Sequence, residues 1–190
     1  MSLNRTLHRL GTVVGCTTVS LAVLTAPAAA APFCGQVWGS TPESAEQHDR
    51  ERLLDVRSGQ HACFDRLVLD LGGQDATFGS YDVRYVPGVV ADGSGDPVPV
   101  RGGAVLQLVV RAPAYDDEGR PTYEPDDPRE LVDVRGYTTL RQVASSGSFE
   151  GTTTLAVGVR AHLPFRVFVL PGTPNSDHTP RLVLDVAHRW

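Results

Sequence analysis

Apolar and polar positions alternate with a period of two along most of the chain after residue 60, which is the pattern of half-buried β-strands. The clearest example spans residues 64–71, where Leu67, Leu69 and Leu71 share one face. The same period predicts further strands over residues 81–86, 104–112, 137–143, 149–160, 165–170 and 182–186. Each segment is short and bounded by Gly, Pro, Asp or Ser. The sequence therefore predicts an all-β fold, a β-sandwich or partly closed barrel of about seven to nine strands.

Three of these segments carry more specific expectations. Residues 104–112 are apolar enough on both faces to predict a central strand. Within 149–160, the alternation places Phe149 on the same face as Leu155. Residues 165–170 are apolar on both faces apart from Arg166, which predicts deep burial.

The polar segment from residue 41 to 57 has a different pattern. Thr41 is suited to cap a helix, Pro42 to occupy its first position, and Glu43 and Glu46 to lie near the positive end of the helix dipole. These signals predict a short helix before the first strand.

A five-residue repeat occurs in two of the predicted strands. Residues 66–70 and 181–185 share the sequence Arg-Leu-Val-Leu-Asp. If the two strands pair antiparallel with their valines opposite each other, Arg66 faces Asp185 and Arg181 faces Asp70, giving two ion pairs across the strands. The repeat equally fits an ordinary pattern of half-buried strands. In both interpretations these aspartates are structural partners of arginine rather than catalytic acids.

Residues 1–30 have the form of a secretory signal peptide, with a basic start at Arg5 and Arg9, an apolar stretch and small residues at 28–30. We predict cleavage after Ala30, which leaves an N-terminal arm (31–52) and a β domain (53–190). The apolar stretch falls short of the roughly 20 residues that span a bilayer, so no membrane span is expected after cleavage. Cys16 lies in a weak lipoprotein-like context, but hydrophobic sequence continues beyond it and lipidation is not expected.

The composition excludes several chemistries. The chain has no lysine, and therefore no Walker A loop, Schiff-base nucleophile or Ser-Lys dyad, because arginine does not lose its proton. Two of the 17 basic residues fall in the predicted leader, so the remainder carries 15 arginines against 22 acids, a formal charge of −7. The arginines are scattered among the acids, and nucleic acid is not an expected partner.

Two cysteines remain after the leader, Cys34 and Cys63. In an exported chain an even pair is most simply a disulfide, which here would join the N-terminal arm to the first predicted core strand. A zinc site is the weaker alternative, because no further Cys or His stands at ligand spacing.

Signatures of catalysis are missing from the sequence. There is no G-x-S-x-G, H-E-x-x-H or C-x-x-C motif. His178 and His188 bracket the last predicted strand, and either could act as the base of a small hydrolase, but a structural or solvent-facing role is favoured. We therefore expect no enzymatic activity, no cofactor and no metal.

The connection over residues 114–129 is long for a hairpin and rich in acids. Tyr115, Asp116 and Tyr123 stand beside Gly and Pro, which favours an ordered loop with aromatic surface. We take these three residues as a candidate ligand-binding loop. Calcium binding is conceivable, but the spacing of an EF-hand loop is missing and a solvated acidic loop is favoured over a cation site.

Several motifs together resemble one family. In chain order they are Val56-Arg57-Ser58-Gly59-Gln60-His61, Phe64-Asp65-Arg66-Leu67-Val68, Pro113-Ala114-Tyr115-Asp116, Pro121-Thr122-Tyr123, Phe149-Glu150-Gly151, Pro164-Phe165-Arg166-Val167-Phe168 and Arg181-Leu182-Val183-Leu184-Asp185-Val186-Ala187-His188. No motif is specific alone, but their order and spacing resemble the AMIN-like domain proteins exported by high-GC Gram-positive bacteria. The resemblance covers about residues 53–190.

The resemblance implies an all-β fold related to the AMIN domain, which is attached in other proteins to cell-wall amidases and secretins, targets the envelope and binds peptidoglycan. It implies no catalysis and supplies no ligand residues. We therefore expect a secreted, non-catalytic protein that binds cell-envelope glycan or an envelope protein, which would place it at the cell wall. The loop from Tyr115 to Tyr123 is the expected contact, because aromatic faces stack on sugar rings. The alternatives are the small hydrolase and a structural protein–protein interaction module that pairs through exposed strand edges.

Overall fold

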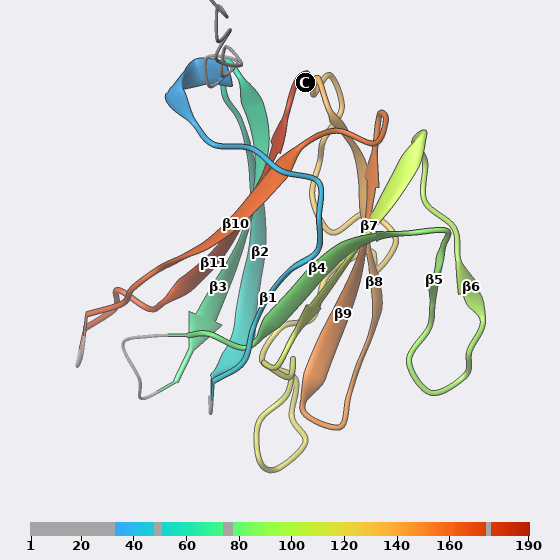
Figure 1. Ribbon diagram of the computed structural model, residues 1–190. Helices are drawn as coiled ribbons and strands as arrows, with labels where there is room; N and C mark the ends of the chain where they lie inside the picture. The colour runs from blue at the N-terminus through green and yellow to red at the C-terminus, as the bar shows by residue number, and fades with distance from the viewer. Residues whose placement is uncertain (1–32, 48–50, 74–77, 174–175) are drawn as a thin grey trace, which may run out of the picture. The chain divides into compact units, whose positions relative to one another are not determined.

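Two antiparallel β-sheets pack face to face in the computed structural model, which describes residues 33–47, 51–73, 78–173 and 176–190 (Figure 1). The first sheet contains, in spatial order, β1 (Glu43–Ala45), β4 (Tyr81–Val86), β7 (Ala104–Val110), β9 (Thr152–Val159) and β8 (Leu140–Phe149). The second contains β10 (Phe165–Leu170), β11 (Arg181–Ala187), β3 (Phe64–Gly72) and β2 (Arg52–Gln60). A small hairpin of β5 (Val89–Val90) and β6 (Pro97–Val98) projects beside the first sheet.

The all-β prediction is confirmed, and the architecture is a sandwich rather than a closed barrel, because no strand pairing joins the two main sheets within the described residues. The helical content of those residues is a single 3₁₀ turn, η1 (Phe33–Gly35). The predicted leader over residues 1–30, with Cys16, lies outside the described residues.

The core lies between the two sheets and is built by the residues that the alternation predicted. Leu67, Leu69 and Leu71 of β3 are fully buried, as are Leu106 and Leu108 of β7. Burial of each such side chain stabilises the fold by about 1.5–3 kcal/mol. Strand β7 lies in the middle of the five-stranded sheet, as predicted.

The short helix predicted within residues 41–57 is wrong. Glu43–Ala45 forms β1 and pairs with β4, and Arg52–Gln60 forms β2 and pairs with β3. A β-bulge between Leu53 and Asp55 breaks the alternation of β2, which is why the sequence pattern concealed this strand. Pairing with two sheets outweighs local helix signals, which are weak for so short a segment.

Two other local predictions are wrong. Phe149 does not share the buried face of Leu155, because it ends β8 and is 54% exposed. A tight turn follows it, in which Glu150 (φ 49°) and Gly151 (φ 83°) both have the positive φ that two-residue hairpins favour. Strand β10 is only partly buried, because it forms an edge of its sheet.

The long connection between β7 and β8 closes one open side of the sandwich. Its start joins β2, where the Leu53 amide donates to the Pro113 carbonyl over 2.9 Å. Its later part joins β8, where the Leu131 amide donates to the Val143 carbonyl over 2.9 Å. Apolar side chains of this connection pack on the core, including Tyr123, Leu131, Val132, Val134 and Tyr137. The segment is therefore an ordered part of the fold.

The N-terminal arm closes the opposite side. Gly39 and Phe165 of β10 exchange two backbone hydrogen bonds of 2.6 and 3.3 Å. A carboxylate oxygen of Glu43 accepts a hydrogen bond of 3.0 Å from the Val167 amide. Burial raises the pKa of Glu43, and the bond from Val167 opposes that rise. The arm thus contributes to both sheets.

Candidate functional site

The repeated Arg-Leu-Val-Leu-Asp segments are paired neighbours in the four-stranded sheet, with their leucines on the core face and their Arg, Val and Asp side chains on the other face. Strands β3 and β11 pair antiparallel with Val68 opposite Val183, which is the predicted register. Arg66 donates from Nε and Nη2 to the two carboxylate oxygens of Asp185 over 2.6 and 2.9 Å. Arg166 of β10 binds the same carboxylate over 2.9 and 2.7 Å. Asp185 is fully buried and therefore serves as the shared counter-ion of two arginines.

The second predicted ion pair differs from the first. Arg181 faces Asp70 in the register, but the Asp70 carboxylate accepts two hydrogen bonds of 2.5 and 2.7 Å from Arg57 of β2. The Nε of Arg181 is buried without a hydrogen-bond partner among the described residues. The sequence repeat could not show that Arg57 takes the place of Arg181 as the partner of Asp70, because Arg57 lies in a segment that was predicted to be helical.

The disulfide joins Cys34 to Cys63, as the sequence predicts, with 29 residues of separation. It fixes the arm beside β3, where the ring centroids of Trp38 and Phe64 lie 5.9 Å apart. The Arg166 guanidinium lies 5.3 Å from the Trp38 ring, a distance typical of cation–π contacts. The disulfide and these contacts secure the arm on the sheet.

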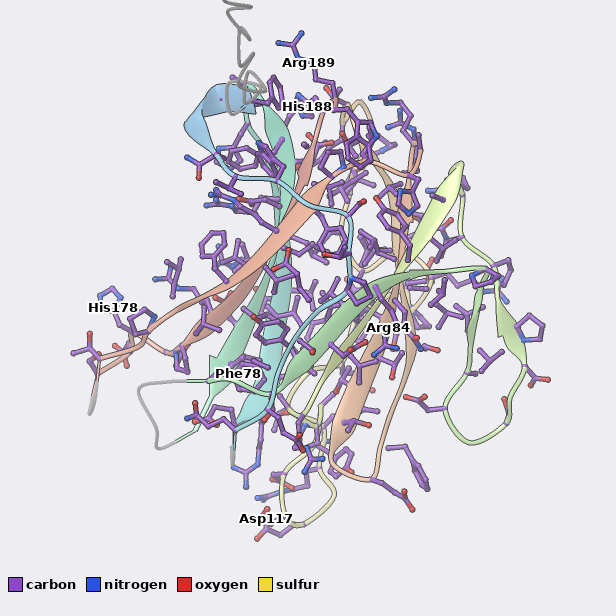
Figure 2. All side chains as sticks on the ribbon, viewed as in Figure 1. Phe78, Arg84, Asp117, His178, His188 and Arg189 are labelled. Atoms are coloured by element: carbon purple, nitrogen blue, oxygen red, sulfur yellow. A yellow bond between two sulfur atoms is a disulfide. The ribbon has the colours of Figure 1, made fainter. Side chains whose placement is uncertain are left out.

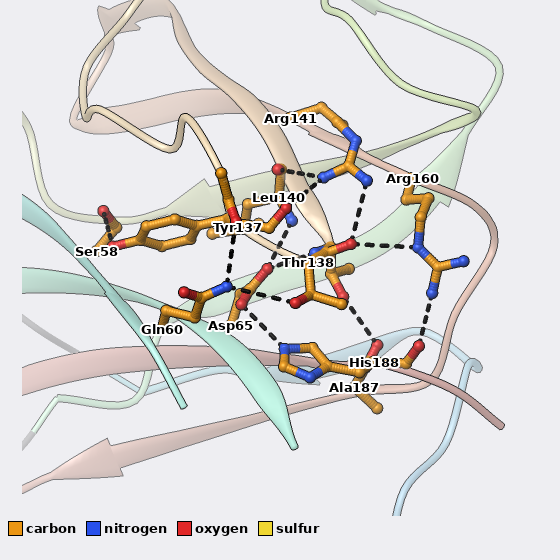
Figure 3. A network of polar contacts seen from close by, with 12 residues as sticks. Ser58, Gln60, Asp65, Tyr137, Thr138, Leu140, Arg141, Arg160, Ala187 and His188 are labelled. Carbon is orange, nitrogen blue, oxygen red and sulfur yellow. Dashed lines mark hydrogen bonds and ion pairs between the residues drawn. The ribbon is translucent and has the colours of Figure 1, made fainter. Parts of the chain in front are cut away.

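His188 forms part of a buried polar network (Figure 3). Its Nε2 lies 3.0 Å from Oδ1 of Asp65, which is fully buried. The other carboxylate oxygen of Asp65 accepts the backbone amides of Thr139 and Leu140 over 2.5 and 3.0 Å. The carboxylate thereby satisfies two amides at the start of β8 and orients the imidazole.

The two candidate histidines lie at opposite ends of β11 (Figure 2). His178 precedes the strand and is exposed, whereas His188 follows it and is mostly buried. Among the described residues the imidazole of His188 forms no hydrogen bond with a Ser, Thr, Tyr or Cys side chain, so its pair with Asp65 has the form of a base and its orienting acid without a hydrogen-bonded nucleophile. Thr139, the neighbouring hydroxyl, donates to the Ala187 carbonyl.

The candidate ligand-binding loop is held in a fixed turn by Asp116. Its carboxylate accepts hydrogen bonds from the Arg120 amide, the Arg120 Nε and the Glu118 amide over 2.8, 2.8 and 3.0 Å. These bonds, led by the Arg120 amide, lower the pKa of Asp116. Tyr115 and Pro121 face each other across this turn as a backbone bridge. Asp116 therefore shapes the loop, and its oxygens are engaged within it.

The two tyrosines of the loop border a cleft of about 350 Å³. One wall comes from the loop itself, with Tyr115, Pro121 and Tyr123, and the other from the β8–β9 hairpin. The hairpin contributes three hydroxyl side chains, from Ser145, Ser148 and Thr153. Tyr123 is half-buried and packs on the core. Its pKa is raised to about 12, chiefly by this burial and to a smaller extent by the nearby charge of Asp55.

Some of these hydroxyls are committed to the fold and others are free to donate. Ser148 Oγ accepts hydrogen bonds from the Ala114 amide and from the Thr153 hydroxyl. The Ser148 hydroxyl donates its own proton to the Thr152 carbonyl over 3.1 Å. In contrast, the Tyr115 hydroxyl accepts from the Gly151 amide over 3.1 Å, so its own proton remains available. The cleft therefore offers aromatic surface beside hydroxyl donors.

The sequence identified the tyrosines but missed the hydroxyl wall. Ser145, Ser148 and Thr153 are some 20 to 40 positions away along the chain and reach the loop only because β8 turns into β9. A cluster of small hydroxyl residues within a strand was the available signal, but it fits an exposed strand equally well.

No group of three or more His, Cys, Asp or Glu side chains is arranged to hold a metal ion in the described part of the chain. Within the same residues, no helix has the length and apolar character needed to cross a membrane.

The fold and cleft define a β-sandwich with a surface cavity of ligand size. The family model of the AMIN-like domain matches residues 51–188, from the residue before β2 to the residue after β11. The chain therefore belongs to the AMIN-like domain family, which confirms the domain family that its motifs resemble. Neither the curated proteins nor the solved structures yield a match.

Proposed function

We propose that this protein is a secreted, non-catalytic module that binds cell-envelope glycan in the cleft between Tyr115 and Tyr123. Membership of the AMIN-like family supports the proposal, because AMIN domains are generally non-catalytic envelope-binding modules. The disulfide fits an oxidising compartment outside the cytoplasm. The observation that carries the proposal is the combination of two tyrosine rings with a wall of hydroxyls.

A sugar ring matches this combination chemically. The C–H face of a pyranose stacks on an aromatic ring, and its hydroxyls require donors and acceptors at the edge. Tyr115 supplies a ring and a free O–H, Ser145 supplies a second hydroxyl, and the exposed Glu124 carboxylate supplies an acceptor at the rim. The cavity volume lies near the lower end of ligand sites, about 300–1,000 Å³, which favours one or two sugar units over a long chain.

Co-sedimentation with purified cell-wall sacculi tests the proposal. We expect the protein to be retained, and Tyr115→Ala to weaken its apparent affinity roughly three- to tenfold, because an aromatic contact contributes about 0.5–1.5 kcal/mol. Tyr115→Phe should keep the stacking and lose only the hydroxyl contact. Tyr137→Phe is the matched control, since Tyr137 is a half-buried tyrosine outside the cleft that contacts Ser58.

Two results would contradict the proposal. The protein could fail to sediment with sacculi, or Tyr115→Ala could bind as well as Tyr137→Phe. Circular dichroism spectra of the three variants establish that each is folded before binding is compared.

A hydrolase is the second candidate, and one observation favours it, the orientation of His188 by Asp65. Turnover of ester, amide or glycoside substrates that is lost in His188→Ala would establish it. The interaction module through strand edges is less favoured, because parts of the β2, β8 and β10 edges are covered by bonds from Pro113, Leu131 and Gly39.

A further inference from the structure

We propose that Arg141 and Arg160 form a second binding site, which takes an oxyanion: the carboxylate or phosphate group of a ligand. The site lies where β8 begins and where β9 and β11 end. It shares no residue with the tyrosine cleft and does not depend on the function proposed there.

The two guanidinium groups converge on one carbonyl oxygen (Figure 3). Arg141 donates from Nη2 to the Thr138 carbonyl over 3.1 Å, and Arg160 donates from Nε to the same oxygen over 3.2 Å. The two donor nitrogens are therefore no farther apart than the sum of these distances. Arg141 is anchored further by the Tyr137 and Leu140 carbonyls over 2.8 and 2.9 Å. The fold thus holds two positive charges side by side.

Neither charge is neutralised by a carboxylate among the described residues. The hydrogen-bond partners of Arg141 and Arg160 are neutral backbone carbonyls, including that of His188 at 2.6 Å from Arg160. The carboxylate of this network, Asp65, is fully buried, and its two oxygens are engaged by the Thr139 and Leu140 amides and by His188. Two guanidinium groups this close together, with no carboxylate paired to them, attract an anion.

Neighbouring arginines show the contrast. Arg101 binds the Glu130 carboxylate over 2.5 and 3.0 Å, and Arg135 binds Asp133 over 2.6 Å. These pairs cancel within themselves. Arg141 lines the same groove as these four residues. Among the described residues that line this groove, Arg141 carries the only charge without an oppositely charged partner.

Free donors remain for a ligand. A guanidinium has five N–H groups, of which Arg141 uses three and Arg160 uses two in the described contacts. The remaining donors suit an oxyanion, because the planar fork of arginine matches two oxygens of a carboxylate or phosphate. The groove beside Arg141 has a volume of about 770 Å³ and apolar lining from Val132 and Val134. The apolar part of an anionic ligand would lie there.

Titration by ¹H–¹⁵N NMR with inorganic phosphate, and separately with acetate, tests the site. We expect saturable shifts of the Nε–H signals of Arg141 and Arg160 and of the Thr138 and Thr139 amides, weakened by added NaCl. Saturation by either anion supports the site, and the tighter of the two assigns the group. Absence of saturation with both anions would overturn it.

The variant Arg160→Gln should weaken binding about tenfold, because it removes charge-assisted hydrogen bonds. Arg141 also anchors the turn before β8, so Arg141→Lys accompanies Arg141→Gln and should retain part of the affinity by keeping the charge. Arg135→Gln, which removes an exposed and paired arginine from the same groove, is the matched control. Equal losses in Arg160→Gln and Arg135→Gln would refute the site. Retention on sacculi with the cleft intact is a separate measurement, so the two proposals can fail independently.

Discussion

Asp185→Ala should be among the most destabilising single substitutions in this chain. The Asp185 side chain is fully buried, and the Arg66 and Arg166 side chains that share it are about one-quarter exposed. Its removal leaves two guanidinium groups close together with no counter-ion. Breaking a buried ion pair by removing one partner destabilises by about 3–5 kcal/mol. For a domain of this size we expect a fall in Tm of roughly 6–20 °C.

The second copy of the repeat supplies a matched comparison. Asp70 occupies the same position in an identical pentapeptide, but its partner Arg57 has a side chain that is 51% exposed. Exposed ion pairs contribute about 1 kcal/mol or less. Asp70→Ala should therefore lower the free energy of unfolding by about 1 kcal/mol, measured beside Asp185→Ala by urea denaturation monitored by circular dichroism.

A compensated variant separates the two physical explanations. If the loss in Asp185→Ala arises from orphaned charges, then Asp185→Leu combined with Arg66→Met and Arg166→Met should recover most of the lost stability, because packed apolar residues can replace a buried ion cluster. Similar losses in Asp70→Ala and Asp185→Ala would refute the reasoning from burial. A combined variant no more stable than Asp185→Ala would refute the reasoning from orphaned charge.

Three further predictions rest on other parts of the fold. Replacing Cys34 and Cys63 together by serine should lower the free energy of unfolding by about 3–4 kcal/mol in urea, from the chain entropy of a loop of this length, and an unchanged midpoint would contradict it. Burial raises the pKa of Tyr81, and it raises the pKa values of Tyr85 and Tyr123 to about 12, so an ultraviolet phenol titration should show at least these last two tyrosines titrating late. Because the folded pKa exceeds the unfolded value of about 10, the stability linked to these groups is present below pH 10 and is lost as the pH rises toward 12. Gly158→Ala should destabilise by at least about 1–3 kcal/mol in thermal unfolding, because its added methyl group would lie 2.0 Å from a backbone carbonyl in the segment before β7.

Part of the site was accessible from sequence because it depends on neighbours along the chain. Tyr115 and Tyr123 are eight positions apart in one loop, and the Gly and Pro residues beside them indicated order. The sequence also proposed Asp116 as part of the ligand-binding loop, and the structure adds that its carboxylate accepts backbone amides that close the turn, a role that local sequence does not distinguish from ligand contact. The hydroxyl wall required the β8–β9 hairpin to be placed against the loop.

The sequence by itself determined the sheet-only fold, because a period of two selects which side chains can be buried together, as Leu67, Leu69 and Leu71 show. It also offered the register of β3 and β11 as one of two interpretations of the repeat, since antiparallel pairing with the valines opposite each other places opposite charges across it. The tertiary structure alone decided that Arg57 rather than Arg181 binds Asp70, that the arm supplies a strand, and that Arg141 and Arg160 meet at one carbonyl. These outcomes join residues far apart in the chain, and competition among several partners of equal chemistry is settled by distance and burial, which no local pattern encodes.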